Sequence, residues 1–157
     1  TVRVSAVVGG DFPEEYVTQL RSRGLDLDGL EVIQEGLTFF WAGRYHSNLN
    51  GRDTITTDLN VLAGFDPVLP SSYRDTRILC LGNLDPKIQL SVLDQVDNPD
   101  LVICDTMNYW IDNTPEHLDE VLAKVDPLII NDEEARQSDR HKGQSGRAEG
   151  EAELHLG

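Results

Sequence analysis

Three short apolar runs, each followed at once by polar residues, constrain the fold of this chain more than any other feature. The runs cover residues 78–81, 101–104 and 127–130. Short unbroken apolar runs of this kind are typical of buried parallel strands. Parallel strands end at a common edge, where open α/β sheets bind ligands. The polar residues that follow the three runs are therefore expected to line one crevice.

The stretches between these runs have a helical pattern. Apolar residues recur at helical spacing over 86–96 and 114–125, and Thr114 is placed as an N-cap before a first-turn proline. The chain also opens on a strand over 2–8, a Gly9-Gly10-Asp11 turn and a helix over about 13–23 with Pro13 at its first position. Strands alternating with helices predict an α/β fold with a parallel sheet and right-handed crossovers.

Residues 31–65 interrupt this alternation. They are rich in β-branched and aromatic residues, in segments that Gly36, Gly43 and a turn at 48–51 separate. The pattern indicates a small β insertion. Three interpretations fit it: a lid over a site, a surface that pairs two chains, or a simple extension of the sheet.

Composition limits the classes of function. The 157 residues amount to about one domain, and the net charge of −15 argues against binding a nucleic-acid backbone. Cys80 and Cys104 lie in apolar runs and are expected to be buried free thiols in a reducing cytoplasm. No leader-like segment is seen, and no apolar run approaches the roughly 20 residues of a membrane helix.

The pattern changes after Ala135. Residues 136–157 contain two leucines near their end and no other large apolar residue, and their 4 basic and 4 acidic residues cancel. Residues 1–135 therefore carry the whole net charge. The segment is interpreted as disordered or foreign to the domain, with a natural flexible tail as the alternative.

Several motifs, in this order and spacing, resemble the PfkB (ribokinase-like) family of carbohydrate kinases. The strand–turn sequence Val7-Val8-Gly9-Gly10-Asp11-Phe12, the later Gly24-Leu25-Asp26 and the pair Asn131-x-x-Glu134 carry the resemblance. A bacterial branch of the family is resembled by five further segments, which are residues 38–41, 59–61, 65–67, 81–83 and 104–108. The resemblance covers about residues 2–135.

The resemblance implies a three-layer α/β/α domain with a small β lid, to which residues 31–62 would contribute. It also implies that Asn131 and Glu134 organise Mg²⁺ and the phosphates of ATP, with Glu134 acting on the metal through water. The alternative for this pair is helix capping, since an Asn followed three residues later by Glu forms a capping-box-like arrangement. The two interpretations are compatible.

Other polar residues follow the predicted strands. Asn83, Asp105 and Asn108 are candidates for a phosphate or substrate rim, and Asp85 is a further candidate. The sequence Asp-Thr-Met-Asn at 105–108 departs from the Asp-Pro-Asn of some family members, so the resemblance is weaker at Asp105 and Asn108. Loop or helix capping is the alternative for all four.

The family's catalytic Gly-Ala-Gly-Asp turn, which supplies an anion hole and a general base, has no counterpart after residue 135. Gly143-Gln144-Ser145-Gly146 lacks the Asp. We therefore expect a partial, internal piece of a kinase that phosphorylates a sugar or nucleoside-like molecule from ATP, without catalytic activity of its own. The alternative is a non-catalytic binding module, or a homodimer formed through the lid.

Overall fold

The fold is described from a computed structural model, which describes residues 1–47 and 52–139. Its internal contacts divide the chain into two compact units. The first is Thr1–Tyr73 and the second begins at Arg74.

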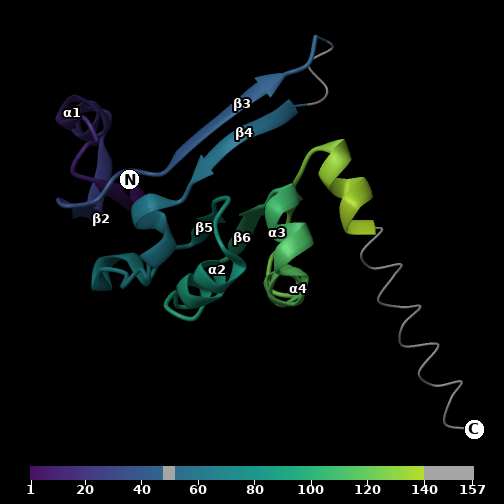
Figure 1. The fold of residues 1–157 in the computed structure, drawn as a ribbon. Helices are drawn as coiled ribbons and strands as arrows, with labels where there is room; N and C mark the ends of the chain where they lie inside the picture. The colour runs from purple at the N-terminus through teal and green to yellow at the C-terminus, as the bar shows by residue number, and fades with distance from the viewer. Residues whose placement is uncertain (48–51, 140–157) are drawn as a thin grey trace, which may run out of the picture. The chain divides into compact units, whose positions relative to one another are not determined.

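The first unit contains a parallel strand pair and an antiparallel hairpin (Figure 1). Short 3₁₀ turns at Asn60–Gly64 and Ser71–Tyr73 follow the hairpin. Strands β1 and β2 pair in parallel, with Val2 opposite Leu25 and Gly9 opposite Ile33. The elements are β1 (Val2–Gly9), α1 (Glu14–Ser22), β2 (Leu25–Ile33), β3 (Phe40–Tyr45) and β4 (Arg52–Asp58).

Tyr73 links the end of this unit to β2. Its hydroxyl donates to Asp26 Oδ1 at 2.7 Å and accepts from the Gly29 backbone N–H at 3.2 Å. The side chain is 4% exposed. A buried hydroxyl with both a donor and an acceptor partner stabilises the strand to which it is bonded.

The second unit contains a three-stranded parallel sheet in the order β5-β6-β7. Helices α2 and α4 are the crossovers between consecutive strands. The elements are β5 (Ile78–Leu81), α2 (Pro86–Leu93), β6 (Leu101–Asp105), α3 (Asn108–Asn113), α4 (Pro115–Leu122) and β7 (Leu128–Ile129). Residues 132–139 are also helical.

The core of the second unit lies between one face of this sheet and the two crossover helices. Leu81, Val102, Cys104 and Val121 form its buried cluster, against which Leu90 of α2 and other partly buried side chains pack. Figure 1 shows α2 and α4 side by side, as their mutual contacts require. Because consecutive right-handed crossovers fall on the same side of a sheet, both helices cover the same face.

The opposite face of this sheet is uncovered in the second unit. On this face Ile78 is 58% exposed and Ile129 is 61% exposed. Cys80, two residues after Ile78 in β5, is exposed on the same face. The prediction that Cys80 is buried is therefore wrong, whereas Cys104, on the covered face, is fully buried. The reason is the two-residue period of a strand, which places Cys80 on the side that no described helix of this unit covers.

The α/β fold with parallel strands agrees with the sequence prediction, and two details differ. Residues 32–33 belong to β2, paired with β1, and not to the β insertion. Gly43 lies inside β3, at a register shift, and does not separate two segments. A Cβ there would meet the Trp41 ring at 2.3 Å, so the position has no room for a side chain. The predicted turn at 48–51 lies outside the described residues.

Two helix termini also differ from expectation. Thr114 precedes α4 without capping it, since its hydroxyl donates to the Trp110 carbonyl of the unpredicted helix α3 at 3.1 Å. The helix after β7 extends through residues 136–139, the start of the segment interpreted as disordered or foreign. Residues 140–157 lie outside the described part of the chain.

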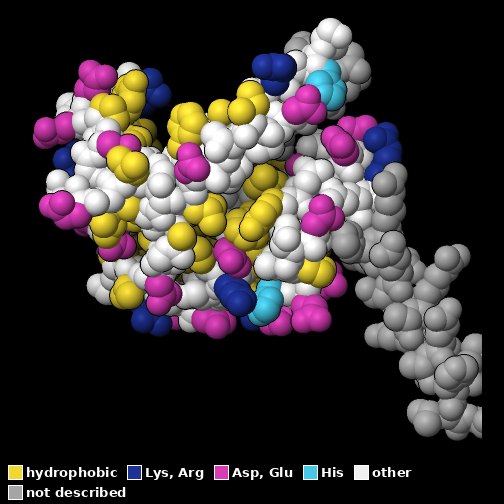
Figure 2. Space-filling model, in the orientation of Figure 1, with side chains coloured by type: hydrophobic (Ala, Val, Ile, Leu, Met, Phe, Trp, Pro, Cys, Tyr) yellow, Lys and Arg dark blue, Asp and Glu magenta, His cyan; other side chains and the backbone are white. Residues whose placement is uncertain are grey.

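The surface is strongly acidic. Figure 2 shows carboxylates spread over the drawn face, with few Lys and Arg among them. This distribution matches the net charge of −15. It does not concentrate at one visible patch.

Candidate functional site at the carboxyl ends of β5, β6 and β7

The polar residues that the sequence singled out follow the three strands of the second unit at a common edge. Asn83 follows β5, Asp105 ends β6, and Asn131 follows β7. The parallel pairing of β5 with β6 and of β6 with β7 brings these strand ends together. This edge is the usual location of ligand sites in open α/β sheets.

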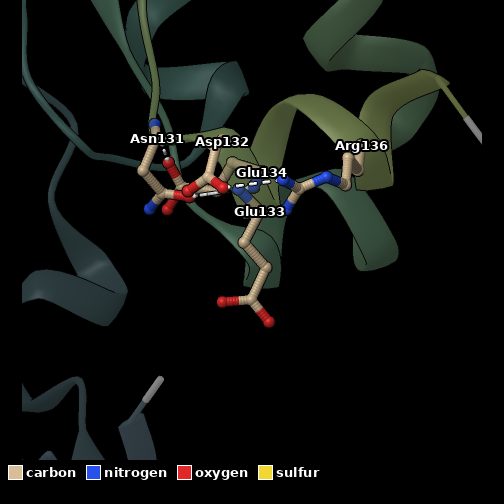
Figure 3. Close-up of polar contacts among 5 residues, drawn as sticks. All are labelled: Asn131, Asp132, Glu133, Glu134 and Arg136. Carbon is tan, nitrogen blue, oxygen red and sulfur yellow. Dashed lines mark hydrogen bonds and ion pairs between the residues drawn. The ribbon is translucent and has the colours of Figure 1, made fainter. Parts of the chain in front are cut away.

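Asn131 and Glu134 form a reciprocal pair at the start of the helix after β7 (Figure 3). The Asn131 Oδ1 accepts from the backbone N–H groups of Glu133 at 3.0 Å and Glu134 at 2.9 Å. In return, Glu134 Oε2 accepts from the Asn131 backbone N–H at 3.0 Å. These bonds satisfy three N–H groups at the helix start, so the capping interpretation of this pair is confirmed.

The Glu134 side chain differs from its neighbours in burial. It is 5% exposed, whereas Asp132 and Glu133 are exposed. Figure 3 shows the Glu133 carboxylate directed away from the pair, and Arg136 bound to Asp132 at 2.8 Å. Within residues 1–47 and 52–139, no Lys or Arg forms an ion pair with Glu134. A buried carboxylate with a backbone donor and no cation is a suitable position for a metal-bound water.

Asn108 is joined to the same helix. Its amide Nδ2 donates to Gln137 Oε1 at 2.7 Å, which connects the start of α3 to the helix that follows β7. Gln137 was missed by the sequence analysis because it lies in the segment interpreted as foreign to the domain. A lone Gln beyond the last apolar residue gave no signal that could have identified it.

Asn83 and Asp85 are both engaged in local structure. The Asn83 Oδ1 accepts from the indole N–H of Trp110 at 2.9 Å, which ties the end of β5 to α3. Asp85 caps α2 by accepting from the Lys87 backbone N–H at 2.9 Å. Capping is therefore the observed role of Asp85.

Gln89 bridges the ends of β5 and β6 and was also missed. Its Nε2 donates to the Gly82 carbonyl at 2.8 Å and to the Asp105 carbonyl at 3.1 Å, and the side chain is 1% exposed. The sequence feature that could have identified Gln89 is a single amide side chain among the apolar positions of α2. The Asp105 carboxylate itself is exposed.

The thiol beside this bridge is unsuited to nucleophilic chemistry. Burial raises the pKa of Cys104 to about 11, with a further contribution from the charge of Asp105. Because the thiolate is the reactive form, Cys104 stays protonated at neutral pH. It acts as a core residue.

Thr106 is the one buried side chain whose polar atom lacks a hydrogen-bond partner among the described residues. It is 4% exposed and directly follows Asp105 at the same edge. Unpaired buried hydroxyls are uncommon and usually bond to a water or ligand.

The described residues do not form a metal site with several protein ligands. Within the two described ranges, no three His, Cys, Asp or Glu side chains form a group that could hold a metal ion. A hydrated Mg²⁺ needs only one or two carboxylates, so Glu134 alone fits a metal held through water. None of the helices described is both long and apolar enough to cross a membrane.

A solved structure resembles this chain in its fold. The structure is a nucleoside kinase from Methanocaldococcus jannaschii, described as an archaeal member of the ribokinase family. It superposes with a TM-score of 0.68 at 18% sequence identity, over 88% of this chain and 46% of the kinase. No protein-family model and no curated protein matches the chain.

The fold is therefore ribokinase-like, as the resemblance implied. The chain spans about half the length of the kinase that it matches. The identity is low enough that the likeness concerns the fold alone.

Proposed function

We propose that this chain is part of a kinase that transfers the γ-phosphate of ATP to a hydroxyl of a sugar or nucleoside-like molecule. The observation that carries the proposal is the buried Glu134 carboxylate, bonded to the Asn131 backbone, at the strand edge of a ribokinase-like fold. Capping alone does not require this Glu to be buried without a cation. A hydrated Mg²⁺ beside it would compensate the charge of this buried carboxylate.

Each candidate residue then has a role set by its position. Glu134 would hold the waters of Mg²⁺, and Asn131 would fix Glu134 and the helix start. When bound, ATP would supply the γ-phosphate and Mg²⁺ would neutralise part of the charge on the phosphates. Asn83 and Asn108 would shape the rim through their contacts with Trp110 and Gln137. The exposed Asp105 would face the approaching substrate.

The substitution Glu134→Gln separates the metal role from the capping role. A Gln at this position keeps an oxygen that can accept from the Asn131 N–H, so the cap is retained, but the negative charge is lost. With Mn²⁺·ATP as the paramagnetic probe, we expect broadening of the amide resonances of residues 131–134 in the parent chain. We expect affinity about tenfold weaker in the variant.

Glu133→Gln is the matched control because it removes the same charge from the adjacent, exposed position. It should bind Mn²⁺·ATP as the parent chain does. Equal broadening in all three proteins, or none in the parent chain, would contradict the proposed metal role.

We also expect that the 157-residue chain does not transfer phosphate by itself. Its sequence holds no Gly-Ala-Gly-Asp turn that could supply the general base and the anion hole. An assay with ATP and ribose, fructose, 2-keto-3-deoxygluconate or adenosine checks this expectation. Turnover above background with any of them would disprove it.

A second candidate function is a dimerisation module, and the hairpin favours it. Phe40, Tyr45 and Ile55 are 54%, 56% and 63% exposed on β3 and β4. Exposed apolar side chains on a two-stranded sheet are typical of an interface between chains. Light scattering that shows a dimer, together with no Mn²⁺·ATP binding, would favour the module over the kinase.

A further inference from the structure

Thr38, in the segment that leads into the hairpin β3–β4, makes three hydrogen bonds to residues at the end of β1. Its backbone N–H and its hydroxyl both donate to Asp11 Oδ1 at 2.7 Å. The same hydroxyl accepts from the Gly9 backbone N–H at 2.9 Å. Thr38 lies two residues before β3, so the first strand of the hairpin is fixed close to where it begins.

The second strand is fixed at the same place. Asn60, two residues after β4, donates from Nδ2 to the Thr38 carbonyl at 2.9 Å. The next residue, Val61, donates its backbone N–H to the Leu37 carbonyl at 3.1 Å. Asn60 has a φ of 49°, a left-handed conformation that Asn tolerates better than most residues. Asp11, Thr38 and Asn60 are called the root cluster below.

The two glycines at the end of β1 and directly after it permit this close approach. A Cβ at Gly9 would lie 2.4 Å from the Gly36 carbonyl oxygen, and one at Gly10 would lie 2.3 Å from that of Gln34. Only glycines leave room for the segment between β2 and β3 against the end of β1. The contact is therefore specified by sequence at Gly9, Gly10 and Asp11 together.

Beyond this cluster, the two strands of the hairpin pair only with each other among the described residues. Their direction relative to β1 and β2 is therefore set by the segments that flank the hairpin, where the root cluster lies and where the Gly10 N–H donates to the Gly36 carbonyl at 3.1 Å. We propose that Asp11 is a positioning residue, which sets the orientation of the β3–β4 hairpin through Thr38. The consequence for substrate binding, with the hairpin as a lid, rests on the proposed function.

The charge of Asp11 supports this role. The hydroxyl and the N–H of Thr38 lower the pKa of the Asp11 carboxyl, so both bonds favour its ionised form. Hydrogen bonds to an ionised carboxylate are shorter and stronger than neutral ones. A single carboxylate oxygen can therefore hold the start of the hairpin.

Residual dipolar couplings of backbone amides test the orientation directly. In the parent chain, couplings from β1 and β2 and those from β3 and β4 should fit one alignment tensor. In Asp11→Ala and in Thr38→Val we expect the hairpin couplings to need a separate tensor of smaller magnitude. Each strand pair should keep its internal hydrogen bonds.

The controls distinguish positioning from general stability. Thr38→Ser retains the hydroxyl and should restore the single tensor, whereas Thr57→Val and Asp66→Ala alter exposed residues of the same unit and should leave it intact. If Asp11→Ala fails to fold, Thr38→Val alone decides the question. A common tensor in folded Thr38→Val would overturn the proposal.

The readout needs neither nucleotide nor turnover. A negative Mn²⁺·ATP result with a positive coupling result would remove the kinase function and keep the positioning role. The reverse pair of results would remove the positioning role alone.

Discussion

The first and second units both contain parallel strands joined through a helix, yet the interactions that stabilise each unit internally are different. In the second unit, Val121 and Cys104 are fully buried in a cluster formed by the sheet and two helices. In the first unit, Val8, Leu27 and Phe65 are buried but no residue of α1 is, and Tyr73 and the root cluster add specific polar links. The comparison shows that parallel strands can be fixed by an apolar core between sheet and helices, or by a smaller apolar core with hydrogen bonds between distant residues.

The largest expected effect is on the core of the second unit. Trp110→Ala should lower the free energy of unfolding by about 3–5 kcal/mol, because it removes a buried aromatic ring and leaves a cavity. The indole also donates to Asn83, whose oxygen would lose its partner. Urea unfolding, followed by hydrogen exchange of β6 amides, measures the change.

The control for this variant is Tyr45→Ala, since Tyr45 is 56% exposed on the hairpin. A surface substitution should change the free energy of unfolding by no more than about 0.5 kcal/mol. Equal effects of the two variants would show that the contrast between the units is wrong.

A smaller effect is expected in the first unit. Tyr73→Phe removes the hydroxyl that joins Asp26 to Gly29 and keeps the ring, so it should cost about 1–2 kcal/mol. Hydrogen exchange of β2 amides measures it, with the exposed Tyr16→Phe as the control. Loss of protection in β6 instead of β2 would contradict the assignment of this bond to the first unit.

The smallest effect is an acid sensitivity of the first unit. The Asp28 backbone N–H and the Tyr73 hydroxyl lower the pKa of Asp26 below its ordinary 3.8, and bonds from Thr38 lower that of Asp11. Because these values are lower in the folded chain, the stabilisation is complete above pH 3.8. It is lost as the pH falls through the lowered values.

This prediction can be checked by hydrogen exchange of β1 and β2 amides as the pH is lowered below 3.8. Asp26→Asn should remove part of the pH dependence, and Asp66→Asn, at an exposed position, should not. An unchanged profile in Asp26→Asn would show that another group causes the acid sensitivity.

The strands and the ligand edge were accessible from sequence because they depend on local patterns. Unbroken apolar runs identified β5, β6 and β7, and the Asn131-x-x-Glu134 spacing identified the capping pair. The bond from Tyr73 to Asp26 was not accessible, since it joins residues 47 positions apart with no shared pattern. Neither was the pairing of Asn108 with Gln137, which crosses an apparent end of the domain.

Cys80 illustrates a different limit of prediction. An apolar strand indicates burial, but it does not say which of its two faces is covered. That depends on the side on which the crossover helices lie, and here α2 and α4 lie on the same side. The sequence of β5 by itself contains no information about this choice.

The uncovered face around Ile78 and Ile129 has a consequence for how separate molecules behave toward one another. Contact between two such faces would bury apolar surface and is therefore favourable, whereas the net charge of −15 on every molecule produces a repulsion between molecules. Salt shortens the range of that repulsion from about 10 Å at 0.1 M to about 3 Å at 1 M. We therefore expect the colloidal stability of this chain to decrease as the ionic strength rises.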